Sequence, residues 1–156
     1  MKKKRYLVTG GFGFIGKAIT KLLLNRGNQV IVIDNNFRGK NIKDFKNKNL
    51  KKYKIDIRDR NKLKKIVKNI DVVIHLAFIN GTNFFYEKPD LVLDVAVRGI
   101  LNILEVSKEN KIKEFFLASS SEVYHYPKKI PTDEKVELLI PDVHNPRYSY
   151  AAGKII

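Results

Sequence analysis

The sequence lacks cysteine altogether, so disulfide bonds and thiolate metal sites are excluded and we expect no metal centre. No apolar run approaches the roughly 18 residues that a membrane-spanning helix needs. The basic start, Met-Lys-Lys-Lys-Arg, imitates a signal peptide, but Gly10, Gly11 and Gly13 interrupt the apolar segment behind it. No small-residue cleavage site follows, and we therefore expect a cytoplasmic protein without a membrane segment.

Acidic residues are scarce, since 16 Asp and Glu oppose 31 Lys and Arg, which gives a formal net charge of +15. Basic proteins often bind nucleic acid. The excess is concentrated in residues 38–68, and most of these bases are lysines. No pattern of aromatic residues and arginines typical of nucleic-acid readers accompanies them. We interpret this segment as a solvated basic face, with a polyanion site as the alternative.

A length of 156 residues and 44% hydrophobic content suffice for one domain with a real core. Short apolar segments rich in Val, Ile, Leu and Phe predict buried strands at 5–9, 29–34, 53–57, 72–76 and 114–119. Helix-length segments separate them, at 14–25, 41–48 (the weakest), 60–68 and 89–109. This alternation predicts a doubly wound α/β fold, a parallel sheet covered on both faces by right-handed crossovers.

Proline is confined almost entirely to one stretch of the chain. Four of the five prolines lie within residues 126–146, which we predict to be a loop. A last helix is expected to begin near Ser149.

A glycine-rich turn follows the first predicted strand and opens the first helix, with the sequence Thr-Gly-Gly-Phe-Gly-Phe-Ile-Gly at residues 9–16. Gly10 permits a tight turn, Gly13 lets the backbone approach a pyrophosphate, and Gly16 lets helix and strand pack closely. The free N–H groups of the helix start then face the phosphates. The context of strand before and helix after predicts a dinucleotide site.

Asp34 ends the second predicted strand, 18 residues past Gly16. A carboxylate at this position accepts hydrogen bonds from an adenosine ribose and repels a 2′-phosphate. The sequence therefore favours NAD over NADP as the cofactor, although Arg38 lies close enough in the chain to keep NADP open.

Tyr150 and Lys154 stand four residues apart and share one face of the last predicted helix. We expect the Lys154 ammonium beside the Tyr150 phenol. A phenol titrates near pH about 10, and a fixed positive charge that favours the phenolate lowers this pKa toward the working pH. The pair predicts an acid/base catalyst.

Together these motifs resemble the extended short-chain dehydrogenase/reductase family, and more narrowly its NAD-dependent sugar-nucleotide epimerases and dehydratases. The resemblance spans residues 6–156. Further motifs of that family stand in order between the glycine turn and the Tyr150/Lys154 pair: Asp34-Asn35, Asp56-Ile57, His75-Leu76-Ala77, Gly99 and Ser119-Ser120-Ser121-Glu122-Val123-Tyr124.

The resemblance implies a role for each matching residue in cofactor binding. The pyrophosphate would lie along Gly10, Gly13, Phe14, Ile15 and Gly16, the adenosine ribose would be held by Asp34 and Asn35, and the adenine would border Asp56 and Ile57. The nicotinamide side would be lined by Leu76, Ala77, Phe78, Tyr150 and Lys154. Plain structural roles compete with these, because Ile57 and Leu76 would be apolar in any buried strand. His75 is interpreted as a hydrogen-bonded core residue and not as a catalyst.

The resemblance also implies a catalytic set of Ser120, Tyr150 and Lys154. Ser120 would hydrogen-bond the substrate oxygen that Tyr150 protonates or deprotonates, in an oxidation to a keto-sugar followed by return reduction. Lys154 would bind the nicotinamide ribose and, with the positive cofactor ring, lower the pKa of Tyr150. In the 4,6-dehydratases the catalytic hydroxyl residue is followed by Asp-Glu. Here Ser121 and Glu122 stand there, which argues against dehydration and leaves epimerisation or decarboxylation.

Extended members of the family continue beyond the lysine with further strands and a region that binds the nucleotide-sugar. The resemblance therefore implies a Rossmann-like NAD-binding domain at residues 1–156, truncated after the Tyr150/Lys154 helix begins and inactive as this fragment. Residues 114–119 would form an uncovered apolar edge strand.

Expected partners are a nucleotide-sugar and either a second copy in a homodimer or a complementing chain. A non-catalytic NAD-binding module that works with a partner subunit is the alternative function. A basic nucleic-acid-binding protein is the less favoured one.

Overall fold

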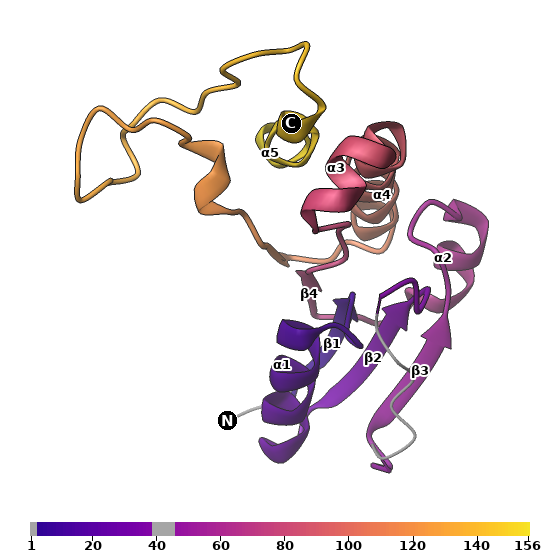
Figure 1. The fold of residues 1–156 in the computed structure, drawn as a ribbon. Coiled ribbons are helices and arrows are strands. Elements are labelled where there is room, and N and C mark those ends of the chain that lie inside the picture. Colours follow the sequence, from indigo (N-terminus) through magenta and orange to yellow (C-terminus); the bar gives the residue numbers. More distant parts are fainter. Residues whose placement is uncertain (1–2, 39–45) are drawn as a thin grey trace. The chain divides into compact units, whose positions relative to one another are not determined.

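A computed structural model describes residues 3–38 and 46–156 of the chain (Figure 1). The elements in chain order are β1 (Arg5–Thr9), α1 (Phe14–Asn25), β2 (Gln29–Asp34), β3 (Leu50–Lys54), α2 (Arg60–Ile66), β4 (Val72–His75), α3 (Thr82–Glu87), α4 (Pro89–Glu109), β5 (Glu114–Leu117), the 3-10 turns η1 (Ser121–Val123) and η2 (Pro146–Tyr148), and α5 (Ser149–Ile155).

Two compact units make up the chain. The sheet unit comprises residues 1–77 and 99–118, and the helical unit comprises residues 78–98 and 119–156. Helix α4 runs from the helical unit into the sheet unit.

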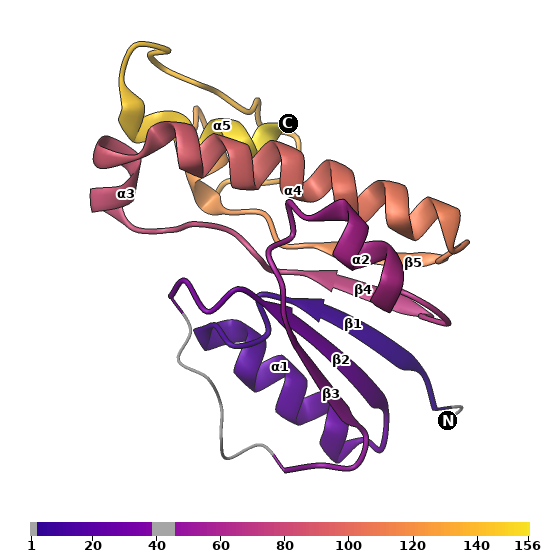
Figure 2. The same cartoon turned by 90° about the vertical axis from the view of Figure 1, so that its right-hand side faces the viewer.

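The sheet unit contains five parallel strands in the order β3-β2-β1-β4-β5. Strands β2 and β3 lie on one side of β1, and β4 and β5 lie on the other side. Because the crossovers are right-handed, the helices that lead to the two sets of strands lie on opposite faces of the sheet. Helix α1 covers one face, while α2 and residues 99–109 of α4 cover the other (Figure 2). This arrangement confirms the predicted doubly wound fold.

The core of the sheet unit lies in β1, β2 and β4, whose residues are buried on both faces of the sheet. Five of these side chains are fully buried, at 0% exposure: Leu7, Val8, Val32, Ile33 and Val73. Burying an aliphatic side chain of this size stabilises the fold by about 1.5–3 kcal/mol. These continuous apolar runs are why β1 and β2 begin and end at the residues that the sequence predicted.

Strand β3 differs from its prediction, because it spans Leu50–Lys54 and not 53–57. Its register is set by β2, since Val30 pairs with Leu50 and Asp34 with Lys54. As an edge strand β3 needs no continuous apolar run, and three of its residues are exposed lysines. Residues 56 and 57 therefore follow the strand and do not belong to it.

Smaller differences concern element ends. Strands β4 and β5 end one and two residues earlier than predicted, and α2 ends at Ile66 and not at residue 68. Residues 41–45 of the predicted weak helix lie outside the described residues, and 46–48 are not helical.

Strand β5 is the last strand on its side of the sheet among the described residues. Phe116 and Leu117 are 57% and 50% exposed. An apolar groove of about 420 Å³ runs beside them and is also lined by Tyr6, Ile19, Ile74, Leu76, Glu114 and Ala118. The expected apolar edge is therefore present.

The helical unit packs around a few large buried side chains. Phe85 of α3 is 1% exposed and Val92 of α4 is fully buried, and Val123 of η1 and Ala151 of α5 are also buried. Helix α3 was not predicted, since it is only six residues long and begins after Gly81. The predicted loop is present, because residues 124–145 contain neither helix nor strand. In the part of the chain that is described, no helix has the length and apolarity to cross a membrane.

Candidate functional site

The glycine turn of the sheet unit starts at Gly10, directly after β1. Gly10 has a φ of +66°, and its N–H donates to the Ile33 carbonyl at 2.8 Å. A Cβ on Gly10 would lie 2.8 Å from the backbone nitrogen of Ala77. Both the left-handed backbone and the close approach of a second backbone require glycine at this position.

Gly16 packs the start of α1 directly on this turn, because a Cβ there would lie 2.2 Å from the Gly10 carbonyl oxygen. Gly13 is the N-cap of α1 and provides no side-chain cap. The N–H groups of the first helical turn thus have no capping side chain, and a helix start with free N–H groups favours an anion. The two residues predicted beside the pyrophosphate, Phe14 and Ile15, are 95% and 59% exposed.

Asp34 ends β2 with its carboxylate held beside the glycine turn. Its Oδ2 accepts the Phe12 N–H at 3.0 Å, and its Oδ1 accepts the Asn36 N–H at 2.8 Å. Each oxygen accepts a backbone N–H group and can accept further hydrogen bonds. The side chain is nearly buried, at 9% exposure, so the carboxylate has a fixed position.

Asn35 and Asp56 form a second polar group next to Asp34. Asn35 Nδ2 donates to Asp56 Oδ2 at 3.1 Å, and Arg58 donates to both Asp56 oxygens, from Nε at 3.0 Å and from Nη2 at 2.8 Å. The hydrogen bond from Arg58 lowers the pKa of Asp56 to about 2. Arg58 was not singled out from the sequence, although its position two residues after Asp56 is a usable signal.

Ile57 is a buried core residue of the sheet unit. It is 4% exposed, and a Cβ on Gly99 of α4 would lie 2.3 Å from its Cδ1. Gly99 therefore lets α4 lie close to the segment after β3, and Asn102 reinforces this contact by donating to the carbonyls of Ile57 and Arg58.

Thr9 joins the end of β1 to the end of β4. Its Oγ1 accepts the N–H groups of Leu76 and Ala77, both at 3.2 Å, and lies 2.8 Å from His75 Nδ1. His75 is 2% exposed. The interpretation of His75 as a hydrogen-bonded core residue is confirmed by this geometry.

The strand order of the sheet unit reverses between β1 and β4, and ligands of open α/β sheets bind at this switch point outside the carboxyl ends of the strands. The glycine turn follows β1 there, and Leu76 and Ala77 follow β4. The sheet unit therefore brings together the residues predicted for the phosphates, the ribose and part of the nicotinamide.

Tyr150 lies in α5 of the helical unit and is 7% exposed. Its ring packs against Phe78 at 5.0 Å between centroids, edge to face, and against Phe85 at 5.3 Å. The Ser120 side chain lies close enough to its phenol to lower the pKa of Tyr150. The fold thus brings together two predicted catalytic residues that stand 30 positions apart in the chain.

Lys154 packs on the aromatic side chains that surround Tyr150. Its Nζ lies over the Phe78 ring, 4.0 Å from the centroid, and 5.9 Å from the centroid of the Tyr150 ring. Burial lowers the pKa of Lys154 to about 8.

Burial also raises the pKa of Tyr150, and the negative charge of Glu122 raises it further, whereas the interaction with Ser120 lowers it. The net effect raises the pKa of Tyr150, because burial of the phenol outweighs the interaction with Ser120, and the expected lowering by Lys154 together with the cofactor ring stays a prediction.

Gly153 lets α5 pack tightly within the helical unit. A Cβ on Gly153 would lie 2.5 Å from the Ala96 Cβ and 3.2 Å from the Phe78 ring. The small side chain of Ala96 on α4 therefore matches the glycine opposite. This contact places the helical turn between Tyr150 and Lys154 against Phe78.

Arg147 and Glu122 form an ion pair that the sequence did not reveal. Arg147 Nη1 donates to Glu122 Oε2 at 2.9 Å. The two residues are 25 positions apart and belong to different 3-10 turns, so no local pattern links them.

In the described ranges, no cluster of three or more His, Asp and Glu side chains is placed to hold a metal ion.

Comparison with known proteins places these features in a family. The family model described as NAD dependent epimerase/dehydratase family matches residues 6–156. The chain is 36% identical over 155 residues to the UDP-N-acetyl-alpha-D-glucosaminuronate decarboxylase of Bacillus cytotoxicus, a match that covers 99% of this chain and 48% of that protein.

Solved structures agree with the sequence match. The UDP-N-acetylglucosamine 4-epimerase of Methanobrevibacter ruminantium M1, in complex with UDP-N-acetylmuramic acid, superposes with a TM-score of 0.86 at 34% identity, covering 99% of this chain and 48% of that one. The UDP-glucose 4-epimerase of Bifidobacterium longum, in complex with NAD+ and UDP, gives 0.85 at 31% identity, covering 97% and 46%. The chain spans about half the length of these relatives.

Proposed function

The chain belongs to the NAD-dependent epimerase/dehydratase family, and we propose that it provides the cofactor-binding and acid–base residues of a nucleotide-sugar epimerase. Membership confirms the family that the motifs resemble and NAD as the family's cofactor. The observation that carries the proposal is that Ser120 lies beside the buried phenol of Tyr150, with Lys154 one helical turn further along α5.

The residues of the sheet unit fit the phosphate and adenosine parts of NAD. The turn leaves room for a backbone approach where a Cβ would clash, and the helix start behind it has no side-chain cap. The Asp34 carboxylate is fixed and can still accept hydrogen bonds from a ribose. In the proposal NAD is held by Gly10, Gly13, Phe14, Ile15, Gly16, Asp34, Asn35, Asp56, Ile57, Leu76, Ala77, Phe78, Tyr150 and Lys154.

When bound, NAD accepts a hydride from a sugar carbon and returns it to that carbon. Tyr150, as a phenolate, takes the proton of the sugar hydroxyl while the carbon becomes a ketone, and gives it back when the hydroxyl re-forms. The Ser120 hydroxyl donates to the same sugar oxygen and holds it within reach of the phenol. Lys154 binds the nicotinamide ribose, and its positive charge together with that of the cofactor ring would lower the raised pKa of Tyr150.

The residues after Ser120 support epimerisation over dehydration. Elimination of water from a keto-sugar needs an additional acid and base, and Ser121 stands where a second carboxylate would be required. Glu122 is the one acid there, and it is paired with Arg147. The proposed substrate class is a nucleotide-sugar, in line with the UDP-sugars named for the relatives.

Calorimetric titration of the purified 156-residue chain with NAD and NADP tests the cofactor half of the proposal. We expect NAD to bind and NADP to bind at least about 10-fold more weakly, because the Asp34 carboxylate repels a 2′-phosphate. Asp34→Asn keeps the shape of the side chain and removes its charge, so the two affinities should converge.

Asp133→Asn is the matched control, since this carboxylate lies in the helical unit and its ion-pair partner is the 64% exposed side chain of Lys129. It should leave both affinities unchanged. Equal binding of NAD and NADP by the wild-type chain would contradict the role of Asp34. Tight DNA binding at physiological salt with no NAD binding would contradict the whole proposal and favour a polyanion site.

A further inference from the structure

The ion pair between Arg147 and Glu122 links the two segments that carry the catalytic hydroxyl groups. Arg147 lies in η2, three residues before Tyr150, and Glu122 lies in η1, two residues after Ser120. Both side chains are about one third exposed, at 32% and 31%, so water screens the pair only in part. An ion pair of this kind contributes more than a fully exposed one.

Arg147 is held in place by more than its partner carboxylate. Its guanidinium lies over the Phe85 ring, 5.0 Å from the centroid, and Phe85 in turn packs on Tyr150. Its backbone N–H donates to Asn145 Oδ1 at 2.9 Å. A planar cation that stacks on an aromatic ring and pairs with a carboxylate is a geometry that arginine provides and lysine does not.

Glu122 is hydrogen-bonded to Ser120 as well as to Arg147. Its backbone N–H donates to Ser120 Oγ at 3.3 Å, which makes Ser120 the N-cap of η1. The same residue therefore holds the catalytic serine through its backbone and the segment of Tyr150 through its side chain. Loss of the ion pair would remove one of the links between the turn of Ser120 and the helix of Tyr150.

The charges that face Tyr150 come from three elements. Glu122 of η1 is negative, Lys154 of α5 is positive but lies over Phe78, and Arg147 of η2 pairs with Glu122. His125, which follows η1, has a pKa lowered by burial and adds no charge at neutral pH. Glu122 disfavours the phenolate of Tyr150, so the compensating charge is that of Arg147.

We propose that Arg147 is a positioning residue for catalysis, which holds the turn of Ser120 against the helix of Tyr150 and neutralises the Glu122 carboxylate beside the phenol. The inference rests on the proposed function for its catalytic meaning. The effect of Arg147 on the pKa of Tyr150 can be measured on the chain alone, without cofactor or substrate.

The test is an NMR titration of the Tyr150 hydroxyl in the chain labelled with ¹³C at the tyrosine ring carbon that bears the oxygen. Tyr150→Phe assigns the resonance among the seven tyrosines. Arg147→Met leaves Glu122 without its partner and should raise the Tyr150 pKa by roughly 0.5–1 unit. Glu122→Gln should lower it, and the double variant should return it to within about 0.3 units of wild type.

Lys128→Met is the matched control, because it breaks the Lys128–Glu137 pair of the same unit, whose side chains are 85% and 81% exposed. It should leave the Tyr150 pKa unchanged. Arg147→Lys keeps the charge and should shift the pKa less than Arg147→Met does. If Arg147→Met fails to fold, Glu122→Gln alone decides the matter, since a Tyr150 pKa that does not fall would overturn the inference.

The two proposals fail in different ways. One outcome is that the chain does not bind NAD, while the Tyr150 pKa rises in Arg147→Met and falls in Glu122→Gln. This outcome refutes the proposed function and supports the electrostatic role of the ion pair. A chain that binds NAD and shows no shift in either variant refutes the role of Arg147.

Discussion

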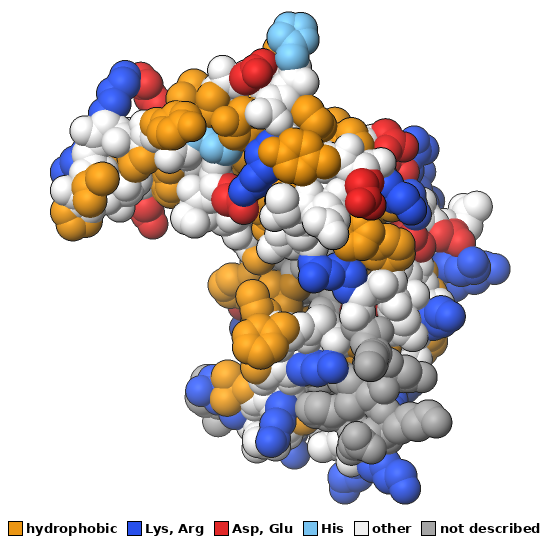
Figure 3. All heavy atoms as spheres, in the orientation of Figure 1, with side chains coloured by type: hydrophobic (Ala, Val, Ile, Leu, Met, Phe, Trp, Pro, Cys, Tyr) orange, Lys and Arg blue, Asp and Glu red, His pale blue; other side chains and the backbone are white. Residues whose placement is uncertain are grey.

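The two units of the chain differ sharply in charge. The helical unit has seven Lys and Arg and eight Asp and Glu, a formal net charge of −1. The sheet unit holds the other 24 bases and eight acids, which is a net charge of +16. On the face in Figure 3, blue side chains with few red ones surround α1, β2 and β3, whereas both colours alternate around the loop 124–145.

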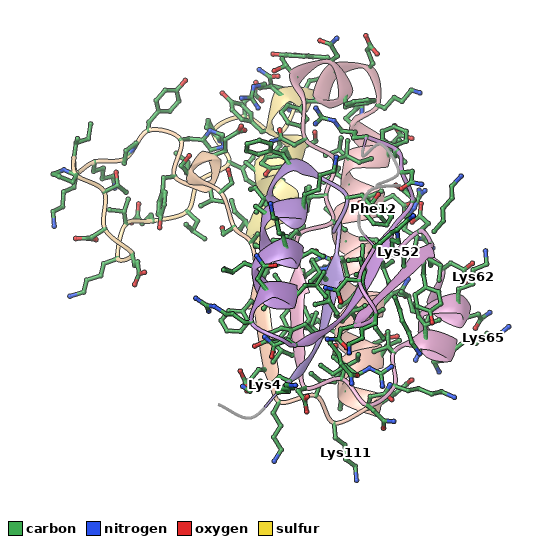
Figure 4. All side chains as sticks on the ribbon, turned by 90° about the horizontal axis from the view of Figure 1, so that it is seen from below. Lys4, Phe12, Lys52, Lys62, Lys65 and Lys111 are labelled. Atoms are coloured by element: carbon green, nitrogen blue, oxygen red, sulfur yellow. The ribbon has the colours of Figure 1, made fainter. Side chains whose placement is uncertain are left out.

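This difference matches what each unit is proposed to hold. NAD carries two phosphates, and a strongly basic unit attracts an anionic ligand over several ångströms. Lys65 and Lys111 point away from the ribbon (Figure 4), and Lys62 forms an ion pair with Asp59. In the helical unit, burial and single neighbouring charges set the pKa values of Tyr150 and Lys154.

The units also differ in what holds them together. The sheet unit depends on strand pairing and on a turn in which two backbones meet, while the helical unit depends on an aromatic cluster around Tyr150. Substitutions in the first should therefore damage the fold and the cofactor site together. Substitutions in the second should separate stability from function.

The largest effect is expected from Gly10→Ala. The substitution combines a φ of +66° with a Cβ 2.8 Å from the Ala77 backbone nitrogen, and neither backbone can move without disturbing β1 or β4. We expect a loss of about 3 kcal/mol in the free energy of unfolding and no measurable NAD binding. Urea denaturation and calorimetric titration give the two values.

Gly27→Ala is the control for backbone strain, because Gly27 has a similar φ of +75° but its added Cβ would meet only the end of the Lys3 side chain at 3.6 Å. It should cost about 1 kcal/mol and leave NAD binding intact. Equal losses for the two variants would show that the contact with Ala77 is unimportant.

Lys154→Met should separate stability from function in the helical unit. Burial lowers the pKa of Lys154 to about 8 in the folded chain, whereas an unfolded lysine keeps its proton up to about pH 10.4. Below pH 8 the buried charge therefore costs stability, and this cost disappears as the pH rises from 8 toward 10.4. At pH 7 the variant should gain about 1 kcal/mol after allowance for solvent screening, and it should bind NAD more weakly.

Urea denaturation at pH 7 and pH 9.5 checks the sign, because the gain should shrink at the higher pH. Lys128→Met, at an 85% exposed side chain, should show no gain at either pH. A gain that grows with pH would refute burial as the cause of the shifted pKa.

The smallest effect on stability is expected from Phe116→Lys at the edge of the sheet unit. Phe116 is 57% exposed, so its replacement should change the free energy of unfolding by less than about 0.5 kcal/mol. A lysine on an edge strand opposes pairing with other chains, and self-association in sedimentation velocity should fall. Tyr126→Lys, at a 74% exposed aromatic of the helical unit, should leave self-association unchanged.

Where residues close in sequence determine a helix or strand, both its existence and its first and last residues could be predicted. The glycine turn, the apolar run of β2 and the uninterrupted periodicity of α4 depend only on neighbours in sequence, and β1, α1, β2 and α4 span the expected residues. The end of β3 could not be predicted in this way, because its register is set by hydrogen bonds to β2. Helix α3 is too short to show a period and depends on the burial of Phe85.

By itself the sequence determined the family, the fold class and NAD as the family's cofactor, because the motifs at Gly10–Gly16, Asp34 and Tyr150–Lys154 are contiguous or closely spaced in the chain. Only the tertiary structure brought Ser120 to Tyr150, placed the Lys154 ammonium over Phe78 and paired Arg147 with Glu122. Burial and the charges of residues distant in sequence set the ionisation of the Tyr150 phenol, and neither is readable from residue spacing.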